Sequence, residues 1–209
     1  FYTLENKRPQ FFEHNIIPYV NEEKILQKIF FKETRRIEIG SHIVSNSSEV
    51  FFIAEIGNNH NGSIENAKKL INISKGAGAH AVKFQLRNMN DLYREKSLKN
   101  IDNDLSVEYT IDLLNKFQLK KESHIELKEY CDDLGILYLC TPWDKSSVGF
   151  LEENFNLPAY KIASADFVNV PLLEKVSQTG KPLILSTGMT TENEIIYIPN
   201  LLNDWGVKF

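Results

Sequence analysis

The sequence predicts an α/β fold of the (β/α)8 TIM-barrel type, incomplete at about five of the eight strand–helix units. From residue 50 onward, short apolar runs alternate with longer stretches whose apolar residues recur at helical spacing, a pattern that also fits a doubly wound sheet. Each run ends in polar residues, which favours the barrel, because barrels collect site residues from many strand ends. Residues 50–209 are too few for a complete barrel of about 250 residues.

The first strand–helix unit begins with an unbroken apolar run at residues 51–54. A run without alternation predicts a strand that is covered on both faces, as in a parallel sheet wrapped by helices. Glu55 ends the run, and a polar loop leads to Ser63, which is suited to cap a helix with an apolar stripe over residues 64–77. We expect the glycines on either side of residue 77 to end that helix.

The residues before this unit form a leader and a predicted hairpin. Residues 1–35 mix aromatic and charged side chains, show weak helical spacing at residues 22–31, and have no assignable role. Alternating residues from 36 onward lead to a polar turn, which predicts a β-hairpin over residues 36–49 at one end of the fold. The predicted division is therefore a leader of residues 1–35 and a barrel part of residues 36–209.

Four more strands and their helices follow in the same alternation. We expect strands at residues 79–86, 136–140, 159–163 and 182–185, and a sixth to begin at residues 207–209. We expect helices at residues 107–117 and 121–134, from Ser146 or Ser147 to Asn154, from Asn169 to about Gly180, and from Thr191 onward. Thr191 and Glu194 have capping-box spacing, and Pro199 should break or kink the last helix near its middle.

Composition excludes several classes of partner. The net charge is −4 and the basic residues are spread along the chain, so neither nucleic acid nor a membrane surface is an expected partner. No apolar run is long enough to span a membrane and no secretory signal begins the chain, so we expect a cytoplasmic protein. Cys131 and Cys140 lack metal or redox spacing and are expected to be reduced core residues. Because the chain begins with Phe1 rather than Met, we expect a fragment.

The polar residues at the strand ends define the candidate site. Two lysines inside apolar strands, surrounded by hydroxyls, suit a small anion that carries both phosphate and carboxylate. A carboxylate beside an amide suits a hydroxyl-rich ligand such as a sugar, and one further aspartate could be a single metal ligand. The strand-end residues are Glu55, Asn59, His60, Lys83, Gln85, Thr141, Lys161, Ser164, Asp166, Ser186 and Thr187.

Five motifs, in order, resemble the N-terminal part of the catalytic barrel of the sialic acid (N-acetylneuraminate) synthase family, which includes legionaminic and pseudaminic acid synthases. The likeness covers about residues 36–198. It implies a metal-dependent TIM barrel that condenses phosphoenolpyruvate with an N-acetylated amino sugar. The motifs are Ala-Glu-Ile-Gly-Asn-Asn-His-Asn-Gly (54–62), Ala-Val-Lys-Phe-Gln (81–85), Cys-Thr-Pro-Trp (140–143), Pro-Ala-Tyr-Lys-Ile-Ala-Ser (158–164) and Leu-Ser-Thr-Gly-Met (185–189).

The resemblance also implies roles for individual residues. The residues implied to hold the phosphate and carboxylate of phosphoenolpyruvate are Lys83, Thr141, Lys161, Ser164 and Ser186, with the lysines acting as charges. Glu55 and Gln85 would face the sugar, and Asp166 would lie near Mn²⁺ or Mg²⁺. The two histidines that complete the family's metal site lie on strands that this sequence lacks. Full-length members of the family are typically homodimers.

Two other interpretations remain open. The protein could be a Schiff-base aldolase in which Lys83 or Lys161 is the nucleophile. It could instead be a non-catalytic truncated fragment that keeps only anion-binding residues. His60 is expected to order the first loop rather than to bind a metal. The sequence does not choose among the possible amino sugars.

Overall fold

The computed structural model describes residues 16–20, 26–31, 36–92 and 105–209, and for residues 16–20, 26–31 and 105–110 the backbone alone. The chain divides into two compact units, residues 1–37 with 43–49 and residues 38–42 with 50–209. The boundary that the sequence predicts after residue 35 stays a prediction.

In the first unit, β1 (Ile16–Val20) and β2 (Leu26–Phe31) pair in an antiparallel sheet. The helix predicted near residues 22–31 is therefore wrong over residues 26–31, while residues 21–25 lie outside the described part. Strand pairing between two segments rich in β-branched and aromatic residues outweighs a weak helical spacing.

A second two-stranded sheet is formed by β3 (Arg36–Ile39) and β4 (His42–Ser45), where the sequence predicts a hairpin. The turn of this sheet belongs to the second unit, and within that unit a Cβ atom at Gly40 would be 3.0 Å from Cδ2 of Leu137. The His42 ring packs against His80, with ring centroids 5.0 Å apart. His42 is thus part of a ring cluster at the start of the strands.

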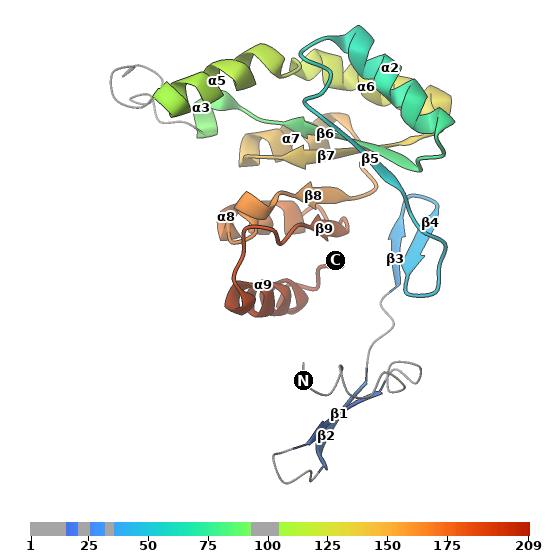
Figure 1. The fold of residues 1–209 in the computed structure, drawn as a ribbon, viewed down its shortest axis with the longest axis vertical. Coiled ribbons are helices and arrows are strands. Elements are labelled where there is room, and N and C mark those ends of the chain that lie inside the picture. Colours follow the sequence, from blue (N-terminus) through green and yellow to red (C-terminus); the bar gives the residue numbers. More distant parts are fainter. Residues whose placement is uncertain (1–15, 21–25, 32–35, 93–104) are drawn as a thin grey trace. The chain divides into compact units, whose positions relative to one another are not determined.

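The second unit is built on one parallel sheet of five strands in the order β5-β6-β7-β8-β9. Neighbours in the sheet are neighbours along the chain, so the order has no reversal of the kind found in doubly wound sheets (Figure 1). The predicted α/β fold with parallel strands is confirmed. The strands are β5 (Ile53–Gly57), β6 (Ala81–Leu86), β7 (Leu137–Pro142), β8 (Tyr160–Ile162) and β9 (Leu183–Leu185).

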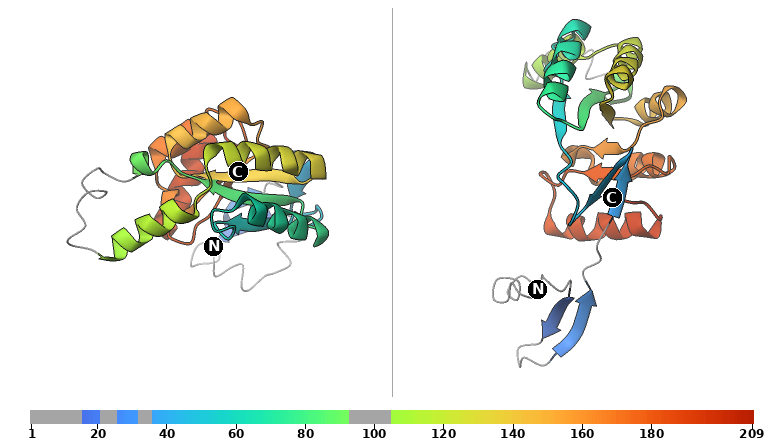
Figure 2. Two further views of the ribbon diagram at one scale, coloured as in Figure 1. Left: turned by 90° about the horizontal axis from the view of Figure 1, so that it is seen from above. Right: turned by 90° about the vertical axis from the view of Figure 1, so that its right-hand side faces the viewer.

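Helices connect these strands and pack against the sheet. Figures 1 and 2 show α2 and α6 side by side along β6 and β7. The helices are α2 (Ile64–Gly76), α3 (Met89–Leu92), α5 (Leu105–Phe117), α6 (Lys121–Leu134), α7 (Lys145–Asn154), the short 3₁₀ helix η2 (Ser164–Asp166), α8 (Val170–Ser177) and α9 (Glu192–Asp204). Among the described helices, none is long and apolar enough to cross a membrane.

β6 has two chemically different faces. Val82, Phe84 and Leu86 belong to the buried apolar core together with side chains of α2 and α6. Since successive side chains of a strand point to opposite faces, Lys83 and Gln85 lie on the other face. The strand alternation thus separates the core from the candidate site.

β5 departs from the prediction that both of its faces are covered. Phe52, just before the strand, is 59% exposed, and Glu55 within it is exposed as well. The reason is position, because β5 lies at the edge of the described five-stranded sheet and pairs only with β6 there.

The helix starts follow capping chemistry. Ser63 accepts a hydrogen bond from the Asn66 backbone, and the capping box of Thr191 and Glu194 is present, as predicted. The start of α7 differs from the prediction, because its N-cap is Asp144 rather than a serine. The Asp144 carboxylate accepts a hydrogen bond from the Ser147 backbone N–H in the first turn of α7. Ser146 and Ser147 lie inside that turn, so neither can be its N-cap.

The sequence predicts a break or a kink at Pro199. α9 runs through this residue as one helix, so the break is wrong, while the kink stays a prediction. Ile198 and Leu202 pack into the core on either side of Pro199, and this burial outweighs the one backbone hydrogen bond that proline removes. The sixth strand predicted at residues 207–209 is not formed, although the Lys208 carbonyl accepts a hydrogen bond of 2.8 Å from the Leu183 backbone.

Replacing Asp144 with Ala should lower the free energy of unfolding by about 2–4 kcal/mol. Asp144 is 7% exposed and accepts hydrogen bonds from the side chain and backbone of Ser147, from the Asn88 backbone and from the Ser146 hydroxyl. Urea denaturation followed by circular dichroism measures the effect. The matched control is Asp133→Ala on the exposed face of α6, which should change stability by less than about 0.5 kcal/mol. Equal effects of the two variants would contradict the capping role.

Candidate functional site

An ion pair joins the first two strands of the sheet near their middles. Glu55 of β5 lies opposite Lys83 of β6 in the parallel register, and the Lys83 Nζ forms an ion pair with Oε2 of Glu55. The same Nζ donates a 3.1 Å hydrogen bond to the Thr141 hydroxyl on β7. Lys83 is 6% exposed, so these two oxygens hold a largely buried ammonium group.

Gln85 lies next to Glu55 because Gly57 leaves room for both side chains. A Cβ atom at Gly57 would stand 3.3 Å from Oε1 of Glu55 and 3.4 Å from Nε2 of Gln85. Gly57 also has a φ of +54°, a conformation that glycine adopts without strain. The carboxylate and amide that the sequence assigns to a sugar are therefore brought together.

The second lysine of the site sits on β8. The Lys161 Nζ donates a 2.6 Å hydrogen bond to the Ile162 carbonyl and another to the Ser186 hydroxyl that follows β9. Among the described residues, no carboxylate lies within ion-pair distance of Lys161. Burial lowers the pKa of Lys161 to about 8, and the positive charge of Lys83 acts in the same direction. The negative charge of Glu55 partly offsets this lowering of the pKa, but the groups bonded to the half-buried ammonium are neutral.

Ser164 and Asp166 lie one step further, in η2. The Ser164 hydroxyl is about 4.0 Å from the position of a Cβ atom at Gly188, so it faces the loop after β9. Oδ1 of Asp166 accepts a 2.9 Å hydrogen bond from Asn169, whereas its buried Oδ2 has no hydrogen-bond partner. In the described part of the chain, no hydrogen bond joins these two residues to the lysines. The roles assigned to them stay predictions.

His60 holds the first loop together. It is 1% exposed, its Nδ1 accepts a 3.0 Å hydrogen bond from the Gly62 backbone, and its ring stacks on Phe84. Burial lowers its pKa, partly offset by a hydrogen bond with the backbone of Gly57. A neutral, buried ring that bonds its own loop fits the predicted ordering role. The other two strand-end residues, Asn59 and Thr187, are exposed.

Sequence reasoning missed Arg87 as a residue of this region. Arg87 is 8% exposed, its Nη2 donates a 2.5 Å hydrogen bond to Oε1 of Gln85, and its guanidinium lies 4.8 Å from the centre of the Trp143 ring. The signal was present in the sequence, because Arg87 continues the period of two that begins with Lys83 and Gln85. Arg87 therefore holds the Gln85 amide in place through its carbonyl oxygen.

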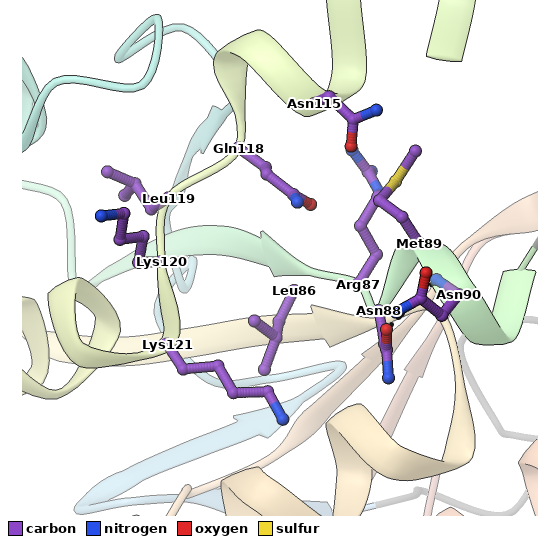
Figure 3. Close-up of a pocket in the computed structure, with 10 residues that line it drawn as sticks. All are labelled: Leu86, Arg87, Asn88, Met89, Asn90, Asn115, Gln118, Leu119, Lys120 and Lys121. Atoms are coloured by element: carbon purple, nitrogen blue, oxygen red, sulfur yellow. Dashed lines mark hydrogen bonds between the residues drawn. The ribbon is translucent and has the colours of Figure 1, made fainter. Parts of the chain in front are cut away.

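A separate pocket of about 380 Å³ lies beyond the end of β6 (Figure 3). It opens between α3 and the connection from α5 to α6, and none of the predicted site residues lines it. The strand-end cluster is thus defined by its hydrogen bonds and charges and not by this pocket. The lining residues are Leu86, Arg87, Asn88, Met89, Asn90, Asn115, Gln118, Leu119, Lys120 and Lys121.

A complete metal site is not formed by the residues that the structure describes. Across residues 36–92 and 111–209, no group of three or more His, Cys, Asp and Glu side chains is placed to hold a metal ion. Cys131 and Cys140 are buried and free, as predicted, and burial raises the pKa of each thiol to about 12. Asp166 remains a candidate for one ligand through its unpartnered oxygen.

The fold and the site together define a parallel α/β domain with cationic, hydroxyl-lined strand ends, and comparison with known proteins places it in a family. Residues 70–206 match the model of the NeuB family, and the chain belongs to that family. It is 41% identical over 173 residues to an uncharacterised protein, MJ1065, of Methanocaldococcus jannaschii, covering 83% of this chain and 48% of that protein.

Two further relatives carry functional names. The chain is 37% identical to the N,N'-diacetyllegionaminic acid synthase of Campylobacter jejuni, covering 77% of this chain and 48% of that enzyme. It is also similar to the crystal structure of an N-acetylneuraminic acid synthetase from Leptospira borgpetersenii, with a TM-score of 0.73, 28% identity, and coverage of 84% of this chain and 57% of that one. The chain spans about half the length of the curated relatives it matches.

The lowered pKa of Lys161 predicts a specific dependence of stability on pH. Between pH 8 and 10.5 the folded state gives up the Lys161 proton while the unfolded state, with the ordinary pKa of 10.5, keeps it. The unfolded state then binds more protons, so stability should rise with pH in this window relative to Lys161→Met. Urea titrations of both proteins at pH 7, 9 and 10.5 measure the difference. A constant difference across these values would contradict the lowered pKa.

Proposed function

We propose that the protein carrying this chain condenses phosphoenolpyruvate with an N-acetylated amino sugar, N-acetylmannosamine or a related sugar, to give a nonulosonic acid and phosphate. The observation that carries the proposal is the placement of Lys83 and Lys161 within two strands of one parallel sheet, each bonded to a hydroxyl, in a chain of the NeuB family. The reaction would serve the biosynthesis of sialic acids or of surface polysaccharides. We also propose that the full-length protein is cytoplasmic and forms a homodimer.

The sheet order supports the barrel part of the proposal. All four strand pairings are parallel and sequential, as in the wall of a (β/α)8 barrel. In such barrels the carboxyl ends of the strands carry the active site. We infer that β5 to β9 are the first five strands of a barrel of this type.

The two lysines are suited to hold the two anionic groups of phosphoenolpyruvate. Ammonium groups bind phosphate and carboxylate as point charges, and Thr141 and Ser186 already orient them from one side. A cationic, partly buried site also stabilises the charge that develops on phosphate as it leaves. Ser164 is proposed to complete this anion site.

Glu55 and Gln85 are proposed to face the sugar. Their carboxylate and amide meet beside Gly57, and together they offer both acceptors and donors to sugar hydroxyls. Two relatives of this chain are named as an N,N'-diacetyllegionaminic acid synthase and as an N-acetylneuraminate-9-phosphate synthase. Their names support a carbohydrate as the second substrate.

Asp166 is a suitable ligand for a divalent cation, Mn²⁺ or Mg²⁺. Oδ2 of Asp166 is a buried carboxylate oxygen without a partner, and such an oxygen is a suitable hard ligand for either ion. When bound, the ion would polarise the carbonyl group of the open-chain sugar. In the proposed reaction, C3 of phosphoenolpyruvate bonds to that carbonyl carbon, water adds at C2, and phosphate leaves by C–O cleavage.

Phosphate release tests the proposed function. The protein expressed from the reading frame that contains this chain should release phosphate from phosphoenolpyruvate only when N-acetylmannosamine or a related N-acetylated amino sugar is present with Mn²⁺. Lys83→Met or Lys161→Met should lower kcat/KM by at least about 100-fold, because each removes a charge that binds the anion. Lys68→Met is the control, since Lys68 pairs with Glu126 on the outer face of α2 and should leave activity unchanged. Release without sugar would contradict the proposal.

Borohydride reduction in the presence of pyruvate separates this reaction from a Schiff-base aldolase. The half-buried Lys161 has its pKa lowered to about 8, which favours an amine nucleophile at moderately alkaline pH. We expect no covalent adduct by mass spectrometry, because both lysines act as charges. An adduct on Lys83 or Lys161 would establish the aldolase instead. A folded protein that binds no phosphoenolpyruvate would leave the third interpretation, a non-catalytic fragment.

A further inference from the structure

The ion pair between Glu55 and Lys83 raises the question of how an anion reaches Lys83. The Lys83 ammonium has three N–H donors, of which Glu55 and Thr141 accept two. The Lys83 side chain is 7% exposed and that of Glu55 is 53% exposed. Glu55 is therefore the partner that can leave the pair, because its carboxylate is then solvated by water, whereas the Lys83 ammonium stays buried.

Within the described part of the chain, Lys161 has no such carboxylate partner. Its Nζ is bonded to a hydroxyl and a carbonyl, both uncharged, so an incoming anion does not have to displace a bonded carboxylate there. The two lysines of the site therefore differ in their bonded partners, although they are the same type of residue. One is already neutralised within the chain, and the other is not.

We propose that Glu55 is an internal counter-ion of Lys83 that the anionic substrate must displace, so that this carboxylate sets the anion affinity of the site. The proposal rests on the proposed function, in which Lys83 binds phosphoenolpyruvate. When an anion takes the place of the carboxylate at Lys83, Glu55 remains beside Gln85, on the side proposed to face the sugar. Displacement of Glu55 from Lys83 thereby makes its carboxylate available to the sugar.

The energetic consequence is a lower affinity for anions than the two lysines alone would give. An anion that takes more than the one remaining N–H donor of Lys83 must break the pair with Glu55, and a partly exposed pair contributes on the order of 1 kcal/mol. Removing the internal competitor should therefore tighten anion binding by about three- to tenfold. Shortening the competitor should have a similar effect, since its carboxylate then no longer reaches the Nζ.

Calorimetric titration of the chain with inorganic phosphate at pH 7 tests this inference. We expect Glu55→Gln to bind phosphate about three- to tenfold more tightly than the unchanged protein. Glu55→Asp keeps the charge but shortens the side chain, and it should also bind more tightly. Glu126→Gln removes a carboxylate from the Lys68 pair on the outer face of α2 and α6, and it should leave the affinity unchanged. Circular dichroism verifies that each variant is folded.

The outcomes separate this inference from the proposed function. If Glu55→Asp binds phosphate like the unchanged protein while Glu55→Gln binds more tightly, simple charge repulsion explains the data and the displacement is wrong. If Glu55→Gln binds no more tightly, Glu55 is not a competitor. If no folded variant binds phosphate or phosphoenolpyruvate, the anion site itself is absent, and the proposed function and this inference both fall.

Discussion

The alternation of side chains along β6 is the constraint on which the second unit depends. Val82, Phe84 and Leu86 turn toward α2 and α6 and form the centre of the apolar core. Lys83 and Gln85 therefore have to point to the opposite face, beside Glu55 of β5. A shift of the strand by one residue would bury the lysine in the core and expose Phe84, so core packing and site chemistry fix the same register.

The site that results is held together by unequal electrostatics. Lys83 is nearly inaccessible to solvent and is balanced by a carboxylate and a hydroxyl. Lys161 is half-buried, lacks a carboxylate partner among the described residues, and has a pKa lowered to about 8. An anion with two charged groups would supply a countercharge to Lys161 and would compete with Glu55 for Lys83. In the proposed function, this imbalance is what gives the site its affinity for a small, multiply charged ligand.

Much of the fold could be predicted, because it depends on local patterns, whereas the roles of the candidate site residues stay predictions. Apolar runs ended by polar residues located the five parallel strands, and the lysines inside two of them marked the site. Contacts that depend on three-dimensional register could not be predicted, above all the pairing of Glu55 with Lys83. Tertiary burial also overrode local rules, since α9 continues through Pro199, and strand pairing replaced the helix expected over residues 26–31.

A crystal structure of this chain with bound phosphoenolpyruvate tests the central claim most directly. The account predicts electron density for the ligand at the strand ends, with its phosphate and carboxylate oxygens within hydrogen-bond distance of the Nζ atoms of Lys83 and Lys161. It also predicts that the Glu55 carboxylate has left Lys83. Density for the ligand in the separate pocket beside Lys120 and Lys121, with the ion pair of Glu55 and Lys83 intact, would contradict the account.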